Sequence, residues 1–335
     1  MCGCSNDLAN NLMSRFPARK LPVLLALLMV MPLPAHAGAT ANMPIQQVDS
    51  AVAEGYQALR ELDGLINAIG FRMAVSSSDL CRDTVPLTGL GLHDIAQYRG
   101  ARVDAVRALS GLGDRVQVMA VAPDSPASRA GVQVGDDILA IDGWQTPEQR
   151  QASGRDEGVE AVTRHLETAG KDGTIRLTIR RRGTPAPFDL QLRPVIGCPG
   201  RFMVNTNNAV QAGSDGRIAS INLGMIEFAA EEDQVAFLIG HEFAHNILKH
   251  RARLLQSGGR GARQAEADAD RWALYLMDRA GYDPSAAALF WRRYKARFGN
   301  PIFSVHPSIA NRIESAEETA AAIRAARARG EVPKP

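Results

Sequence analysis

Two histidines separated by one helical turn carry the clearest chemistry in this 335-residue chain. They stand in the run His241-Glu242-Phe243-Ala244-His245. Residues four apart lie on the same face of a helix, so both imidazoles can reach one metal ion. Glu242 lies beside that face, where its carboxylate can take a proton from a metal-bound water. The spacing therefore indicates a zinc-dependent hydrolytic site.

The sequence around this motif predicts the buried helix that a metal site needs. Residues 231–250 contain no proline, and Glu231 and Glu232 stand where a helix N-terminus favours negative charge. Apolar residues recur there at spacings of three and four, namely Val235, Leu238, Ile239, Phe243 and Ile247. The alternative is a pair of core histidines that only make hydrogen bonds.

A catalytic zinc usually takes three protein ligands and leaves a fourth position for water. His250 is one candidate for the third ligand. Five residues correspond to about 500° of helix, so His250 is expected to point away from His241 and His245. We interpret it instead as a cation at the helix end, where it interacts with the helix dipole.

Glu266 is the second candidate, in a helix predicted over residues 262–280. A Gly/Ser-rich break at residues 256–261 allows this helix to fold back on the first. Glu266 and Asp270 are four apart, so one carboxylate can bind zinc while the other accepts an N–H from a ligating histidine. Asp268 lies about 200° from Glu266 and is expected to face solvent. Acidic residues also suit the first turn of any helix.

These ordered motifs resemble the gluzincin metallopeptidases of the HtpX/BepA and CAAX-prenyl-protease type, which pair HExxH with a downstream ExxAD, here residues 266–270. The similarity covers roughly residues 221–313 and includes residues 281–284, Gly-Tyr-Asp-Pro, which are similar to the family's GxDP. The resemblance implies a mostly helical zincin-type domain with a small sheet. It also implies one Zn²⁺ per chain, held by His241, His245 and Glu266.

A later part of the resemblance concerns the segment His306-Pro307 followed by Arg312-Ile313, which is similar to the family's HPxxxxRI. The resemblance implies that His306 lies at the rim of the zinc site and binds the substrate carbonyl or the oxyanion. A loop histidine with no role is the alternative. Arg312 is expected to anchor the C-terminal helix by pairing with a carboxylate near the site.

The N-terminus is typical of a secretory signal peptide. Three basic residues precede an apolar run over residues 21–33, and Ala35-His36-Ala37 matches an A-x-A cleavage site. We therefore expect residues 1–37 to be removed near Ala37, with Met1 or Met13 as the start. The run is too short for a good membrane span, and no other long apolar segment follows. A periplasmic or secreted enzyme without a stable span in its mature chain is predicted, unlike the membrane-embedded members of the family.

The cysteines agree with export. Cys2 and Cys4 would leave with the signal peptide, so the mature chain keeps Cys81 and Cys198. Two cysteines in an exported protein are predicted to form a disulfide. Free buried thiols are the alternative.

A second unit lies between these two cysteines. Residues 116–121 predict a strand, and residues 124–143 resemble the SPAxxAGxxxGDxIxxIxG signature of bacterial PDZ domains. Residues 158–169 then predict a helix and residues 174–179 a strand. PDZ domains bind extended peptides by adding a strand beside a helix. Here such a ligand would be recruited for cleavage, or the domain would act as a spacer or lid.

The loop that would receive the peptide's C-terminal carboxylate is assigned to Gly89-Leu90-Gly91-Leu92, with residues 111–113 as the second choice. A helix over residues 48–69 and a short strand over residues 71–75 precede this unit.

Together these patterns predict an α+β protein. We expect residues 38–80 and 199–330 to form one peptidase domain, with the PDZ domain inserted as residues 81–198 and a frayed tail at residues 331–335. The PDZ domain would be a small β-barrel or sandwich with helices. Lys and Arg number 38 against 36 Asp and Glu, so no nucleic-acid partner is indicated.

The predicted function is zinc-dependent cleavage of protein or peptide substrates, such as misfolded envelope proteins, in envelope quality control or processing. Substrate is expected to lie along an edge strand around residues 220–224. The alternative is a PDZ adaptor or chaperone-like protein with a latent or structural metal site.

Overall fold

The structure is a computed structural model that describes residues 50–148, 157–170, 172–299 and 306–335. The predicted signal peptide lies outside the described residues. The first half of the chain forms α2 (Ser50–Ser76), the 3₁₀ helix η1 (Ser78–Leu80), β1 (Val85–Leu87), β2 (Leu90–His93), the 3₁₀ helix η2 (Ile95–Gln97), α3 (Ala101–Ser110), β3 (Gln117–Val121), α4 (Pro126–Arg129), β4 (Asp137–Ile141), β5 (Trp144–Gln145) and α5 (Glu157–Thr168). The second half forms β6 (Ile175–Arg180), β7 (Phe188–Leu192), β8 (Val195–Gly197), β9 (Arg201–Asn205), β10 (Ala212–Ser214), β11 (Ile218–Asn222), α6 (Leu223–Ala229), α7 (Glu232–Ile247), α8 (His250–Gln256), α9 (Ala262–Ala280), α10 (Ala286–Phe298) and α11 (Ile309–Ala328).

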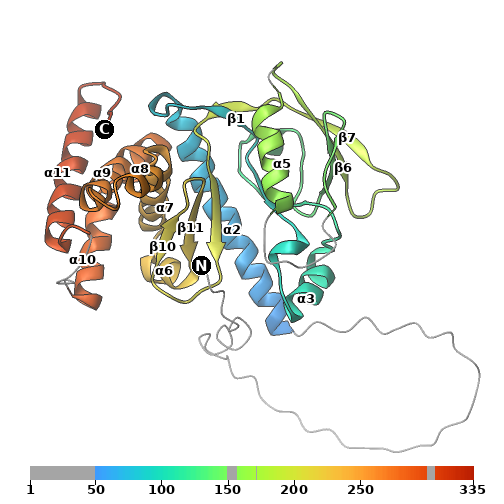
Figure 1. The fold of residues 1–335 in the computed structure, drawn as a ribbon, viewed down its shortest axis with the longest axis horizontal. Coiled ribbons are helices and arrows are strands. Elements are labelled where there is room, and N and C mark those ends of the chain that lie inside the picture. The colour runs from blue at the N-terminus through green and yellow to red at the C-terminus, as the bar shows by residue number, and fades with distance from the viewer. Residues whose placement is uncertain (1–49, 149–156, 171, 300–305) are drawn as a thin grey trace, which may run out of the picture.

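Two units pack on opposite sides of the long helix α2, as Figure 1 shows. One is rich in strands and contains α3 to α5, and the other is mostly helical and contains α6 to α11. Each has its own apolar core. The protein is therefore of the α+β class, as the sequence predicted.

The strand-rich unit is built on an antiparallel sheet of order β2-β3-β4-β6-β7, with β5 paired to β4. In β6, Ile175, Leu177 and Ile179 are buried while Arg176 and Arg180 are exposed. This alternation places one face of the strand in the core. The strands predicted near residues 116–121 and 174–179, and the helix predicted near residues 158–169, correspond to β3, β6 and α5.

The helical unit surrounds a three-stranded sheet of order β10-β11-β9. Helix α7 packs on this sheet and lies against α9, which places the two predicted ligand helices side by side. The close approach depends on Gly240, because a Cβ there would lie only 3.3 Å from the backbone of Ala273 on α9.

The chain enters the strand-rich unit and leaves it again at one place, where two contacts join the entering and leaving segments. Strand β1 pairs antiparallel with β8, and Cys81 is bonded to Cys198 next to that pair. The disulfide predicted from the sequence is therefore present, and it holds together two chain segments 117 residues apart.

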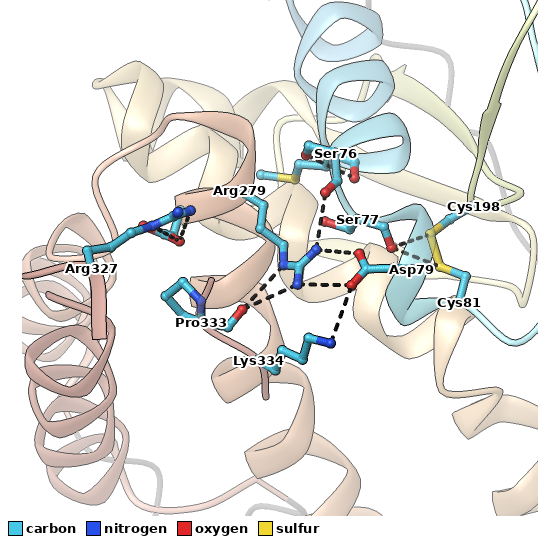
Figure 2. A network of polar contacts seen from close by, with 11 residues as sticks. Ser76, Ser77, Asp79, Cys81, Cys198, Arg279, Arg327, Pro333 and Lys334 are labelled. Atoms are coloured by element: carbon cyan, nitrogen blue, oxygen red, sulfur yellow. Dashed lines mark hydrogen bonds and ion pairs between the residues drawn. A yellow bond between two sulfur atoms is a disulfide. The ribbon is translucent and has the colours of Figure 1, made fainter. Parts of the chain in front are cut away.

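Two local expectations were wrong. Residues 71–75 do not form a strand but continue α2, because Ile66, Ile69 and Met73 extend its buried face at helical spacing. The C-terminal tail is not frayed, since the buried Pro333 accepts hydrogen bonds from Arg279. Figure 2 shows this anchoring beside the disulfide, with Lys334 reaching Asp79.

No helix in the described part of the chain is long and apolar enough to span a membrane.

Candidate metal centre

Three predicted ligands converge at the contact between α7 and α9. The Nε2 atoms of His241 and His245 lie 3.1 Å apart. Glu266 reaches both rings, with Oε2 3.5 Å from His241 and Oε1 3.5 Å from His245. One ligand atom from each residue lies within 4.8 Å of the others.

This donor set suits zinc. Two imidazole nitrogens and one carboxylate oxygen are a usual ligand set for catalytic Zn²⁺, whose fourth position takes water or substrate. His241 is buried, and Glu266 keeps only 16% of its side-chain surface exposed, so a bound ion would be largely shielded from solvent. The residues therefore fit the metal that the sequence predicted.

Asp270 orients His241 from behind. Its Oδ1 lies 2.9 Å from His241 Nδ1, which directs Nε2 of that ring toward the ligand cluster. Arg312 donates to both carboxylate oxygens of Asp270, at 2.5 and 2.6 Å. The guanidinium also lies over the ring of Trp291, 3.6 Å from its centroid. Asp270 and Arg312 thus form a chain of contacts behind His241, and their roles at the site stay a prediction.

These contacts change the protonation of the cluster. Burial alone lowers the pKa of His241, but its hydrogen bonds to Asp270 and Glu266 outweigh burial and raise that pKa to about 10. Burial and the neighbouring His241 charge lower the pKa of His245 to about 3. Burial raises the pKa of Glu266, but its hydrogen bonds to His241 and His306 outweigh burial and lower that pKa below the ordinary value.

His250 does not point away from the site, contrary to the sequence-based expectation. The α7 helix ends before Lys249, whose left-handed backbone (φ 54°) turns the chain into α8. His250 is thereby buried, with its Nδ1 3.0 Å from Nδ1 of His245. It contacts the side of His245 opposite the ligand cluster, so it supports a ligand and is not part of the converging set.

Glu242 lies between the ligand cluster and β10. Its side chain is buried and hydrogen-bonds to Ser214 in that strand. Burial is the main reason that its pKa is raised above the ordinary value. A buried carboxylate of raised pKa is well matched to accepting and returning a proton near neutral pH.

Strand β10, next to Glu242, is one of the two end strands of its sheet, and within the described part of the chain its outer side pairs with no other strand. The N–H of Asp215 bonds to the carbonyl of Ile218 in β11 at 3.2 Å. Bonded and non-bonded residues alternate along antiparallel strands, so the backbone groups of Ala212 and Ser214 point outward from this edge.

The predicted position of the edge strand was therefore wrong. Ser220 lies in β11, which pairs on both sides, and Gly224 belongs to α6. The apolar alternation of β11 suits a central strand. The three-residue β10 is too short to show any pattern in the sequence.

His306 lies at the entrance to the cluster. Its Nε2 is 3.2 Å from Oε2 of Glu266, and its side chain is 45% exposed. Ser308 caps the following helix. The predicted position at the rim agrees with this geometry, and the role of His306 in binding substrate stays a prediction.

The residues predicted to form the peptide-binding loop are not all in a loop: Gly89 lies between β1 and β2, whereas residues 90–92 belong to β2, the end strand of the large sheet. Gly89 has a positive φ of 81°, and its carbonyl accepts a hydrogen bond from Asn67 of α2 at 3.1 Å. Leu90 and Leu92 pack into the core of the strand-rich unit. The second choice, residues 111–113, instead terminates α3.

Comparisons with known proteins separate the same two units. The family model for the PDZ domain matches residues 117–153, and that for peptidase family M48 matches residues 254–320. The second match contains Glu266, Asp270, His306 and Arg312. No curated protein matches the chain.

One similar solved structure is the HtrA3 PDZ domain bound to a phage-derived ligand, FGRWV. It is 19% identical, with a TM-score of 0.26, over 34% of this chain and 89% of that chain. The match to peptidase family M48 supports a metallopeptidase, and the match to a PDZ domain supports peptide binding. This chain thus combines a segment that matches a PDZ domain with a segment that matches peptidase family M48.

Proposed function

We propose that this protein is an exported zinc-dependent endopeptidase that cleaves unfolded or misfolded envelope proteins. One observation carries the proposal: His241, His245 and Glu266 converge, with Glu242 placed between them and a free strand edge. Export is supported by the disulfide and by the signal-peptide pattern of residues 1–37.

In this proposal the substrate adds a strand to β10. The outward backbone groups of Ala212 and Ser214 pair with the peptide and bring a carbonyl carbon beside Glu242. Such main-chain pairing is largely independent of sequence, which suits cleavage of unfolded chains.

Zinc, when bound, supplies a Lewis acid for the carbonyl and makes water acidic enough to react near neutral pH. Glu242 accepts the proton of the attacking water at its carboxylate and transfers it to the departing amide nitrogen. His306 donates a hydrogen bond to the carbonyl oxygen as negative charge grows there. Asp270 and Arg312 hold His241 in place throughout.

The PDZ domain binds an extended peptide at residues 89–92, which comprise the turn before β2 and the start of that strand, and recruits the substrate chain. The proposed partners are therefore protein substrates and their exposed ends.

Casein turnover by the purified protein tests the proposal. Activity should vanish with a chelator and return with zinc, and Glu242→Gln should lower it by about a hundredfold or more while zinc content stays at one per chain. Glu314→Gln, an exposed residue of α11, is the matched control and should retain activity. Binding of casein without any cleavage would reject the peptidase and favour a PDZ adaptor.

A further inference from the structure

A pocket of about 420 Å³ lies beside the candidate active site and has no part in the chemistry described above. It is bounded by the segment after the disulfide, the start of β9, the β10–β11 turn and the helices α7 and α8. Its charged and polar lining residues are Arg82, Asp83, Arg201, Asp215, Arg217, Asn246, Lys249 and Arg251.

The distance of the pocket from Glu242 can be followed along helix α7 and along the end of strand β10. Asn246 lies one helical turn after Glu242 on α7, and Gly216 lies two residues after Ser214. The N–H of Gly216 bonds to Asn246 Oδ1 at 2.8 Å, so strand end and helix end stay together. One helical turn is about 5.4 Å, and a strand advances about 3.3 Å per residue. A peptide along β10 therefore passes the pocket about two residues from its reacting bond.

The carboxylates of the pocket are already engaged. Asp83 pairs with Lys249 at 2.7 Å. Asp215 accepts the backbone N–H groups of Arg217 and Ile218, at 2.8 and 2.7 Å. These two carboxylates therefore offset only two of the five positive charges in the pocket lining.

Two of the five positively charged residues form no close ion pair within the described part of the chain. Arg201 and Arg217 form ion pairs with acidic residues of α5 in the PDZ unit, and Lys249 is paired as described. Among the described residues, no ion pair within 4.0 Å is formed by Arg82 or Arg251. However, the pKa of Asp83 is lowered by its hydrogen bond to Lys249 and, to a smaller extent, by the charge of Arg82. The pocket is therefore positive where it can contact a ligand.

The remaining wall is apolar. Pro199, Ile247, Ala252 and Leu255 line it, and Leu255 is 74% exposed. A side chain that carries methylene groups and ends in a carboxylate matches both parts of this surface, because guanidinium groups bind carboxylates with two parallel hydrogen bonds.

We propose that this pocket is a specificity subsite that binds an acidic side chain, glutamate or aspartate, about two residues from the cleaved bond. This inference rests on the proposed peptidase function and names a preference of the same site.

A set of peptides blocked at both ends tests the subsite. Each peptide carries either Glu or Gln at the second or third residue on one side of the cleaved bond, with the bond located by mass spectrometry. At one of these positions, Glu should raise kcat/KM about tenfold over Gln. Replacing both arginines, as Arg82→Gln with Arg251→Gln, should bring that ratio close to one. The control Arg324→Gln, on α11, should leave the ratio unchanged.

The outcomes separate this proposal from the peptidase proposal. Zinc-dependent cleavage with equal rates for Glu and Gln peptides at all positions overturns the subsite and leaves the peptidase standing. A preference gained only with a free C-terminus would assign the pocket to a terminal carboxylate and also overturn it. If no peptide is cleaved, peptide binding to the Glu242→Gln variant is measured by fluorescence anisotropy. The subsite requires that the Glu peptide bind more tightly than the Gln peptide, and that this difference be lost when Arg82 and Arg251 are both replaced.

Discussion

His245 and His250 face each other through their Nδ1 atoms, 3.0 Å apart. If Nε2 of His245 binds a metal, its Nδ1 carries a hydrogen and needs an acceptor. Nδ1 of His250 is in position to be that acceptor. His250 Nε2 is buried without a partner among the described residues, so its only hydrogen bond in the structure is the one to His245.

We expect His250→Leu to weaken zinc affinity by about 10- to 100-fold, as loss of a hydrogen bond to a ligating histidine usually does. His250→Asn should recover much of the affinity, because its side-chain oxygen replaces the acceptor near the Nδ1 position. Competition with a chromophoric chelator measures both variants. Equal affinities for the Leu and Asn variants would show that His250 only fills space.

The free edge of β10 leads to a prediction about Ser214. Ser214→Pro removes an outward N–H that the proposed substrate strand would use, and it leaves the bond between Asp215 and Ile218 intact. We expect kcat/KM on an unfolded substrate to fall about tenfold or more. Ser214→Ala, which keeps the N–H but loses the hydroxyl bonded to Glu242, is the control. Because the Pro variant lacks this hydroxyl as well, equal losses in the two variants would contradict edge pairing.

The disulfide should contribute strongly to stability. Closing a loop of 117 residues is worth about 4–5 kcal/mol on the chain-entropy model. Cys81→Ala should therefore lower the free energy of unfolding in urea by a value of this order, and reductant should have the same effect on the parent protein. Adding reductant to the variant should change nothing further. Two free thiols in the denatured, unreduced parent protein would refute the bond.

Asp63 on α2 should make stability depend on pH. Burial raises its pKa to about 6, against the opposing effects of Arg60 and the backbone N–H of Val204. The folded state therefore favours the protonated carboxyl of Asp63. The contribution of this carboxyl to the free energy of unfolding is fully present below pH 3.8 and is lost as pH rises through about 6.

Asp63→Asn should consequently be more stable than the parent above pH 6, by at most about 3 kcal/mol, with the difference shrinking toward pH 4. Glu61→Gln, an exposed change on the same helix, should show no such trend. Urea titrations at several pH values provide the measurement, and parallel curves for all three proteins would reject the assignment.

Several features of this protein follow from the sequence alone because they depend on local periodicity. The four-residue spacing of His241 and His245, and of Glu266 and Asp270, places each pair on one helical face wherever the helices lie. The glycine and apolar pattern of residues 124–143 likewise indicates the PDZ unit, since turns and alternating strands are set by neighbouring residues.

Other features depend on contacts between distant segments, so only the tertiary structure decided them. His250 returns to His245 because Lys249 adopts a left-handed conformation, which ends the helical periodicity on which the sequence argument relied. The edge strand is β10 because β11 pairs with β9 on its other side, and no local pattern in three residues can reveal that. The subsite pocket combines four segments that are adjacent only in the folded chain. Local side-chain periodicity determines which residues share a face, but long-range packing determines what that face meets.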